Sequence, residues 1–393
     1  MKIFFDKFCL PSQKNIVIQK DQITLTESFI PGCDLYFSNE SSNSLNSYLS
    51  IFEEDSFEII SENYFKMAKE LKIKNPKWNL LLKKDEYTRF RSLFKSRLTN
   101  LVGKINSIEY SDYYASGNYV VNNLSNIHID IKSLEERIRS ESNPTLKSIV
   151  SSFLPKENNI CKNITYNRMK TTTGRLVVSD GPQILLLPKD TRSSIVSRYG
   201  KEGSVLWVDF VSLEPRFTKL LSSKETSVDI YSDIIKDSSI DCSREKVKLA
   251  VLSTLFGAGM KKLTEILGKD AFEVRKAIKE YFKLDKVSEK IGNYKSGKIK
   301  NFFGRNIFLK SPNFNLSLNN YIQSSCVDIS LIGFSSLLQD PDFPKSAKPV
   351  AVVHDALVLD VKNNDLQKLE EIINKGIDID NLGKFYLGFE SYE

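Results

Sequence analysis

The chain of 393 residues contains only two histidines, His128 and His354, and five cysteines. Two histidines are too few for a His-rich metal site of the kind that HD-type phosphohydrolases use. The cysteines are odd in number, widely spaced and never arranged as CxxC, which argues against a disulfide framework and a structural zinc site. The cysteine pattern therefore indicates a reducing compartment.

Long apolar segments are also missing. The sequence has no run of 18 apolar residues, and its amino terminus, MKIFFDKFCLPSQ, becomes charged too early for a signal peptide. We therefore expect a soluble, cytoplasmic protein with no membrane partner. Because 41% of the residues are hydrophobic and 11% are aromatic, the chain can form the cores of two or more domains.

Two common catalytic patterns are absent or incomplete. GNYKSGK (292–298) fits the GxxxxGK phosphate loop, but Ile299 follows it where the loop requires Ser or Thr, and a charged segment precedes it where the loop requires an apolar strand. We interpret this match as accidental. A Ser/His/Asp triad built on His354 is only a remote alternative, because the sequence has no GxSxG elbow.

Positive charge is concentrated in one segment. Residues 66–104 contain 12 Lys or Arg and 3 Asp or Glu, so this segment is more positive than the whole chain, whose net charge is +7. Apolar residues recur there every three or four positions, which predicts a helix. A basic segment on a near-neutral body is typical of a protein with a phosphate-bearing partner, although a solvated helix face explains it equally well.

Two aspartates lie at the ends of apolar, strand-like segments. Asp209 follows SVLWV, and Asp355 follows His354 within KPVAVVHDALVLDV. Burying an unpaired carboxylate costs several kcal/mol, so either a cation meets Asp355 or the chain bends there. Aspartates on adjacent strands could hold two Mg²⁺ or Mn²⁺ ions about 3.5 to 4 Å apart, the arrangement for phosphoryl displacement. The alternative is that each Asp caps a helix or a turn.

A third segment, SREKVKLAVLSTLFGAG, carries cations and apolar residues in one line. Arg244, Lys248, Leu252 and Phe256 recur every four residues and so lie on one face of a predicted helix. A triphosphate could lie across the two cations while its base packs toward Leu252 and Phe256. An amphipathic core helix would explain the two apolar residues equally well, but not the cations.

Together these segments resemble family A DNA polymerases, the DNA polymerase I type. WVDFVSLEPRF is similar to the family's first catalytic motif, REKVKLAVLSTLFG to its fingers helix, and VVHDALVLDV to its second catalytic hairpin. TTTGRL, DIY, FFGRNIFL, NNYIQSSCVDIS and NIHIDIKSLEERI are similar to further family segments, and they follow in the family's order over about residues 125–393.

The resemblance implies an α+β right-hand fold. It predicts a palm with an antiparallel sheet and helical fingers within residues 171–393, with the fingers at about 240–300, and a reduced thumb at 126–170. Residues 1–125 would form a small N-terminal region that includes the basic segment 66–104.

The resemblance also implies template-directed transfer of dNTPs to a primer 3′-hydroxyl with two Mg²⁺ ions, or Mn²⁺ as the alternative. Primer-template DNA and dNTPs are the expected partners, together with replication accessory proteins. The metal ligands would be Asp209, Asp355 and the Phe210 carbonyl, and the two aspartates would be catalytic. The implied nucleotide-binding residues are Arg244, Lys248, Leu252, Phe256, Tyr231 and Glu214, the last excluding a ribose 2′-hydroxyl. The implied DNA-binding residues are Arg175, Asn319, Gln323 and His354.

The sequence departs from the family at several positions. Ala356 stands where the family has Glu, Leu252 replaces an aromatic residue, and Tyr231 replaces a histidine. The thumb segment is short, so we hypothesise that the basic segment, with Arg89, Arg91 and Lys95, grips the DNA backbone instead. Too few residues precede the resemblance for the usual proofreading domain, so we expect no proofreading, and the brevity suggests a phage or mobile element.

Two rival interpretations remain at this point. One is a catalytically weak, polymerase-like accessory factor that binds primed DNA, which Ala356 and the short thumb favour. The other is a reverse transcriptase or RNA polymerase with similar chemistry; Glu214 argues against the RNA polymerase, and the sequence does not identify the template.

Overall fold

The structure is a computed structural model that describes residues 1–7, 9–10, 14–20, 22–38, 45–52, 70–72, 78–155, 158–223, 226–238 and 242–392. The chain forms two compact units, Met1–Asn118 and Tyr119–Glu393, which we call unit 1 and unit 2 and describe separately. Of the predicted basic segment 66–104, residues 66–69 and 73–77 lie outside the described residues.

Unit 1 contains a four-stranded sheet in the order β3-β2-β1-β4. Neighbouring strands are antiparallel except β1 and β4, which are parallel. Phe5 and Phe37 stack with ring centroids 5.5 Å apart, and Tyr48 packs on Phe37 from the following helix. The strands are β1 (Lys2–Phe5), β2 (Asn15–Gln19), β3 (Gln22–Thr26) and β4 (Leu35–Phe37).

The helices of unit 1 are α1 (Leu45–Ser50), α3 (Trp78–Leu81), α4 (Lys84–Ser107) and α5 (Tyr110–Asn122), whose last residues belong to unit 2. The Glu86 carboxylate accepts a hydrogen bond from the Lys83 backbone N–H at 3.1 Å, which fixes the start of α4. Near its end α4 buries Leu98, Leu101 and Ile105, and it is thereby anchored to the core of unit 1.

Unit 2 is built on an antiparallel sheet in the order β12-β13-β9-β16. The strands are β9 (Gly203–Phe210), β12 (Lys348–Val353), β13 (Ala356–Lys362) and β16 (Leu387–Ser391). Every residue of β13 except its last is buried. Continuous apolar runs of this kind are expected for strands covered on both faces.

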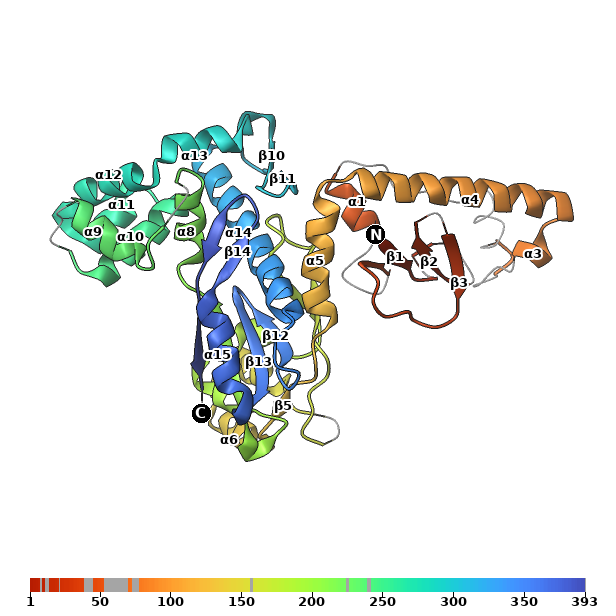
Figure 1. Ribbon diagram of the computed structural model, residues 1–393, viewed down its shortest axis with the longest axis horizontal. Helices are drawn as coiled ribbons and strands as arrows, with labels where there is room; N and C mark the ends of the chain where they lie inside the picture. The colour runs from red at the N-terminus through yellow and green to blue at the C-terminus, as the bar shows by residue number, and fades with distance from the viewer. Residues whose placement is uncertain are drawn as a thin grey trace. The chain divides into compact units, whose positions relative to one another are not determined.

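Two helices pack near this sheet (Figure 1). They are α14 (Phe314–Gln339), which contacts β14 (Ile377–Ile379), and α15 (Leu366–Lys375), which contacts β16. A Cβ at Gly333 of α14 would lie 2.8 Å from the Phe210 ring, so glycine permits the close packing of β9 against this helix. Of the described residues, only α14 is long and apolar enough to cross a membrane, but 72% of that apolar window is buried inside the protein.

The helices that follow β9, up to residue 291, lie beyond one end of the sheet (Figure 1). Gly257, with φ of 80°, follows α10 and ends it in the left-handed conformation that favours glycine. The helices are α8 (Leu213–Leu220), α9 (Ile230–Ser238), α10 (Arg244–Leu255), α11 (Met260–Leu267), α12 (Ala271–Phe282) and α13 (Leu284–Ile291).

Short elements complete unit 2. Asp130 caps α6 by accepting hydrogen bonds from two backbone N–H groups of its first turn. These elements are β5 (His128–Ile129), α6 (Ile131–Ser140), α7 (Pro144–Ser151), β6 (Thr165–Asn167), β7 (Val177–Asp180), β8 (Ile195–Val196), β10 (Lys298–Lys300), β11 (Asn306–Phe308) and β15 (Gly383–Phe385). The 3₁₀ helices are Ile184–Leu186, Lys189–Ser194, Gly200–Glu202, Gly268–Asp270, Tyr294–Ser296 and Asn363–Asp365.

Candidate functional site

The bend between β12 and β13 consists of His354 and Asp355. Val353 and Ala356 are paired across the hairpin, so these two residues form the whole turn. His354 has φ of 58°, a left-handed conformation that is uncommon for residues other than Gly, Asn and Asp. Of the two sequence-based alternatives for this run, the structure has the bend. It leaves His354 exposed and Asp355 half-buried.

The second aspartate, Asp209, lies beside this turn. It is paired with Ala356 of β13 on one side and with Gly388 of β16 on the other. Burial and the nearby Asp355 charge raise the pKa of Asp209, while solvent still reaches Asp209 and screens part of this repulsion. Burial also raises the pKa of Asp355, an effect that His354 and Arg175 partly offset. The sheet therefore brings two mutually repelling carboxylates to one edge.

Two glutamates add to this negative region. Burial and Asp355 raise the pKa of Glu214, in the first turn of α8, and Arg175 counteracts the shift. The Glu390 charge also acts on Asp209. Glu390 lies on the same face of the sheet as Asp209, because it is two residues from Gly388 along β16. Tyr392 donates a hydrogen bond of 2.7 Å to its carboxylate.

The carboxylate oxygens of Asp209 and Asp355 are ligands that suit a divalent cation of the Mg²⁺ type. Within the described residues, no three or more His, Cys, Asp or Glu side chains form a group that could hold a metal ion. Mg²⁺, however, is usually bound by one or two carboxylates, with water and substrate phosphates as its other ligands. Asp209 and Asp355 supply that number, and a cation between them would relieve the Asp355 repulsion that, after burial, raises the pKa of Asp209.

Arg244 and Lys248 extend from α10 into solvent, as the spacing predicts. Leu252 on the same line is half-buried and Phe256 is 37% exposed. The core of α10 is instead formed by other residues: Val247, Ala250, Val251, Thr254 and Leu255. Core packing therefore does not account for this line of side chains.

Arg244 is linked to the acidic edge through its neighbours. Its Nε donates to Asp229 Oδ2 at 2.8 Å and its Nη2 to Oδ1 at 3.2 Å. This pairing holds the pKa of Asp229 at about 2. The Arg244 guanidinium also lies 5.4 Å from the centre of the Tyr231 ring. Tyr231 is buried, and after burial itself the Glu214 charge raises its pKa further, so Tyr231 lies near both Arg244 at the start of α10 and Glu214 at the start of α8.

Arg216 holds these two regions together. Its guanidinium is fully buried and donates hydrogen bonds to the carbonyl oxygens of Val211, Ser227 and Val228 and to the Thr226 hydroxyl. It also stacks on Tyr386 at 4.6 Å. Arg216 thus joins the turn after β9 to the segment that leads into α9, which fixes Asp229 and Tyr231 relative to Asp209.

The residues expected to contact DNA belong partly to unit 2 and partly to unit 1. Asn319 and Gln323 are one turn apart on α14, and both are half-buried. The Asn319 Oδ1 atom is buried and has no hydrogen-bond partner among the described residues. Arg175 and His354 are exposed in unit 2. Arg89, Arg91 and Lys95 are exposed on α4 and belong to unit 1.

Two residues of the site are absent from the sequence-based expectations. Asp229 belongs to the segment DIY, for which only Tyr231 has an expected role. The opposite charge of Arg244, 15 positions later, is the signal that could have indicated their pairing. Glu390 gives no local signal, because its proximity to Asp209 depends on the pairing of β16 with β9.

Three comparisons relate the chain to known proteins. The model of the family "DNA polymerase family A" matches residues 93–384. The DNA polymerase I proteins of two Helicobacter pylori strains are each 24% identical to the chain over 248 residues, which are 54% of this chain and 27% of each relative. The chain therefore spans about a quarter of the length of these relatives.

A solved structure is also similar. It is the POL domain of Pol1 from M. smegmatis in complex with DNA primer-template and dNTP, with 19% sequence identity and a TM-score of 0.48. The match covers 66% of this chain and 55% of that chain.

Proposed function

The chain belongs to DNA polymerase family A, and from this membership we propose that it is a template-directed, DNA-dependent DNA polymerase that adds dNTPs to a primer 3′-hydroxyl. One observation carries the proposal beyond the family. The pairing of β13 with β9 brings Asp209 and Asp355 to one edge, and Tyr231 links that edge to the cationic line of α10. Tyr231 therefore lies near both the acidic residues that would hold a cation and the cations that would hold a triphosphate.

Asp209, Asp355 and the Phe210 carbonyl would hold two Mg²⁺ ions, or Mn²⁺. When bound, these ions lower the pKa of the primer hydroxyl and neutralise charge on the phosphates. The pairing of β9 with β13 fixes the backbone of Asp209, and Asp355 lies in the adjacent two-residue turn, so the fold would position both ligands. Their raised pKa values reflect a site that favours added positive charge.

Arg244 and Lys248 would bind the triphosphate by charge-assisted hydrogen bonds. Leu252, which is half-buried, and Phe256, which is exposed, follow along the same line and would pack against the base. Glu214, with Tyr231 beside it, would exclude a ribose 2′-hydroxyl and so favour dNTPs. Asn319, Gln323, Arg175 and His354 would position the primer-template, and the unpartnered Asn319 oxygen supports this role.

We assign the parts of the fold accordingly. The sheet β12-β13-β9-β16 would be the palm, α10 to α13, within about residues 240–300, the fingers, and residues 126–170 a reduced thumb. The exposed basic residues of α4 would add a grip on the DNA backbone. The absence of proofreading is part of the proposal, and it is tested by incubating the protein with a 3′-mismatched primer without dNTPs; shortening of that primer would contradict it.

Primer extension tests the function directly. The parent protein is expected to extend a primer with Mg²⁺ and dNTPs on a DNA template, and to do so poorly with rNTPs or on an RNA template. The controls are Asp209→Asn and Asp355→Asn. DNA binding without extension by the parent would support an accessory factor instead, and extension that survives both substitutions would refute the assigned site.

Charge reversal on α4 tests the grip. Reversing Arg89, Arg91 and Lys95 to Glu should weaken duplex binding and flatten its salt dependence by roughly one unit of slope per lost phosphate contact. Reversal of Lys368, Lys375 and Lys384, three exposed lysines of unit 2, makes the same change of charge and is the matched control. Unchanged affinity and slope in the α4 variant would rule out this role.

A further inference from the structure

Arg175 is an exposed cation near the acidic edge that Asp209 and Asp355 form. Burial raises the pKa values of Asp355 and Glu214, and the Arg175 charge counteracts both shifts. Among the described residues no carboxylate forms an ion pair with Arg175, so its guanidinium is available to a ligand. Residues 168–175 belong to no helix or strand, so no regular ladder of backbone hydrogen bonds fixes the position of Arg175.

A tight turn leads into Arg175. The Gly174 N–H donates to the Thr171 carbonyl oxygen at 3.2 Å, and the Thr171 hydroxyl donates to the Arg175 carbonyl oxygen at 3.0 Å. Gly174 has φ of 79°, the left-handed conformation that favours glycine. These bonds fix Arg175 relative to the turn, but they do not fix the turn relative to the rest of unit 2.

The guanidinium of Arg305 lies against this turn. A Cβ at Gly174 would be 3.1 Å from Arg305 Cζ, 3.1 Å from its Nε and 3.4 Å from its Nη1. Since these three distances are nearly equal, the turn packs on the flat face of the guanidinium and not on its edge. Arg305 is 2% exposed, and its Nη2 donates to the Arg168 carbonyl oxygen at 3.5 Å. Arg305 therefore contacts the irregular segment near both of its ends.

Arg305 is itself held by a buried polar network. Its backbone N–H donates to Asn301 Oδ1 at 2.9 Å, and Asn301 Nδ2 donates to Asp328 Oδ2 of α14 at 2.6 Å. Arg168 forms an ion pair with the other oxygen of Asp328 at 3.5 Å, and both side chains are 2% exposed. Buried ion pairs add little net stability, which points to a role of this network in fixing geometry.

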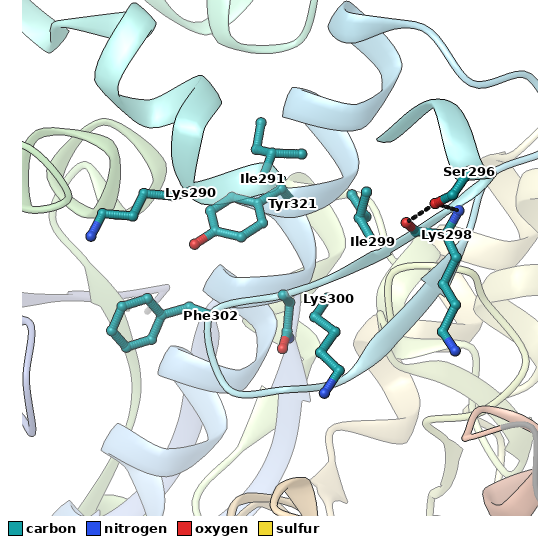
Figure 2. Close-up of a pocket in the computed structure, with 9 residues that line it drawn as sticks. Lys290, Ile291, Ser296, Lys298, Ile299, Lys300, Phe302 and Tyr321 are labelled. Atoms are coloured by element: carbon teal, nitrogen blue, oxygen red, sulfur yellow. Dashed lines mark hydrogen bonds between the residues drawn. The ribbon is translucent and has the colours of Figure 1, made fainter. Parts of the chain in front are cut away.

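The loop that carries Arg305 has an outer and an inner side. Its outer side helps to line a pocket of about 410 Å³ where α13, β10 and α14 meet, together with Lys290, Lys298 and Lys300 (Figure 2). Part of this lining comes from the segment GNYKSGK, which does not form a strand–loop–helix phosphate loop, because it follows α13 and leads into β10. Arg305 does not line the pocket and is buried on the inner side of the loop.

We propose that Arg305 is a positioning residue, which holds the turn 171–175 and thereby keeps Arg175 near the acidic edge, where Arg175 contacts primer-template DNA. The inference rests on the proposed polymerase function, which assigns Arg175 to the primer-template. A lysine at position 305 would keep the charge but not the flat face, so the turn would lose its support. With arginine, the position of Arg175 is set before DNA binds, which reduces the entropy lost on binding.

A double-mutant cycle on DNA affinity tests the proposal. Fluorescence anisotropy without dNTPs would give the Kd of a primer-template for the parent, Arg175→Ala, Arg305→Lys and the double variant. Arg175→Ala should weaken binding about tenfold, the loss of one charge-assisted contact. Arg305→Lys should weaken binding about fivefold in the parent but less than about 1.5-fold in Arg175→Ala, because no arginine side chain is then left to misplace.

A second variant changes the turn without changing the core. Thr171 is half-buried, and Thr171→Val removes the hydroxyl that donates to the Arg175 carbonyl oxygen. This variant should weaken binding about twofold in the parent and have no effect in Arg175→Ala. It decides the proposal if the melting temperature shows that Arg305→Lys is not folded.

The matched control makes the same substitution in another ion pair of unit 2. Arg198 pairs with Asp360 at 2.8 Å, and Arg198→Lys should have the same effect on affinity with and without Arg175.

Four results would overturn the proposal: equal losses from Arg305→Lys in the two backgrounds, no loss from either Arg305→Lys or Thr171→Val, no loss from Arg175→Ala, or a background dependence of Arg198→Lys as large as that of Arg305→Lys. The first would leave Arg305 with a purely structural role. Since binding is read without extension, these results are distinct from a failure of the polymerase assay.

Discussion

The acidic edge of the sheet, which consists of Asp209 and Asp355, and the cationic line of α10, which consists of Arg244 and Lys248, carry opposite charges. The fold also positions their side chains in different ways. Asp209 and Asp355 belong to two paired strands and a two-residue turn whose backbone is fixed on both sides. Arg244 and Lys248 extend from an exposed helix face, and Arg244 has an exposed partner in Asp229. The carboxylates repel one another, whereas the arginine is already neutralised.

This difference indicates how each region would respond to a ligand. The pairing of β9 with β13 holds the backbones of the two aspartates near each other, so a proton or a cation relieves their repulsion. Arg244 can exchange its carboxylate partner for a phosphate, because an exposed ion pair contributes only about 0.2 to 1 kcal/mol. The acidic edge is therefore a fixed site, and the cationic line is an exchangeable one.

The largest effect is expected where the fixed site loses charge. Asp209→Asn or Asp355→Asn should lower the rate of primer extension about 10³-fold or more, because the remaining ligands no longer hold the metal pair. DNA affinity, measured by anisotropy, should stay within about threefold, since neither change removes a positive charge. Asp378→Asn, on the exposed side of β14, is a matched control that should retain the parental rate.

The cationic line should respond in substrate affinity. Lys248→Ala is expected to raise the KM for dNTP about 10- to 100-fold, the loss of one charge-assisted hydrogen bond to phosphate, with DNA binding little changed. Lys246→Ala removes an exposed lysine from another face of the same helix and should leave the KM within twofold. Equal effects of the two changes would mean that α10 attracts substrate only by its total charge.

Removing the carboxylate partner of Arg244 should lower the KM for dNTP. This change is smaller than the one expected for Lys248→Ala and opposite in direction. Asp229→Asn is expected to lower the KM for dNTP about two- to fivefold, because the triphosphate no longer competes with an exposed carboxylate. Asp237→Asn, on the same helix, controls for the loss of negative charge. If the KM rises instead, Asp229 acts by orienting Arg244 and the pair is not exchangeable.

The smallest effect concerns stability. The folded-state pKa of Asp209 is raised, so the native protein binds more protons than the unfolded chain between the two pKa values, and stability falls as pH rises through that window. Asp209→Asn removes the ionisable carboxyl group, so the variant does not lose this stability as the pH rises. In EDTA it should raise the melting temperature by about 2 to 4 °C at neutral pH, with no gain near pH 4. A gain that is independent of pH would contradict the repulsion between the carboxylates.

The sequence predicts the site better where the signal is local. The bend at His354 and Asp355 follows from placing a polar pair inside an apolar run, and the line along α10 follows from a four-residue repeat. The family, inferred from ordered motifs, is confirmed. By contrast, nothing in SVLWVDFV indicates that β9 pairs with both β13 and β16, because strand pairing is set by packing between distant segments. Glu390 was missed for that reason.

The arrangement of the basic residues was also only partly predictable. Periodicity placed Arg89, Arg91 and Lys95 on a helix, now α4, but gives no information on what that helix contacts. The three lysines of the pocket lie on α13 and β10 and meet only through the tertiary fold. Charge counted along the chain therefore identified the basic helix and missed the basic pocket.

If His354 positions the primer-template as proposed, its left-handed backbone sets folding and activity against each other at one position. Glycine or asparagine would adopt this turn conformation at lower energetic cost than histidine. A library of all amino acids at position 354, selected only for soluble expression, should thus be enriched in Gly and Asn. The same library selected for replication of a primed template should return histidine, at the expense of some thermal stability.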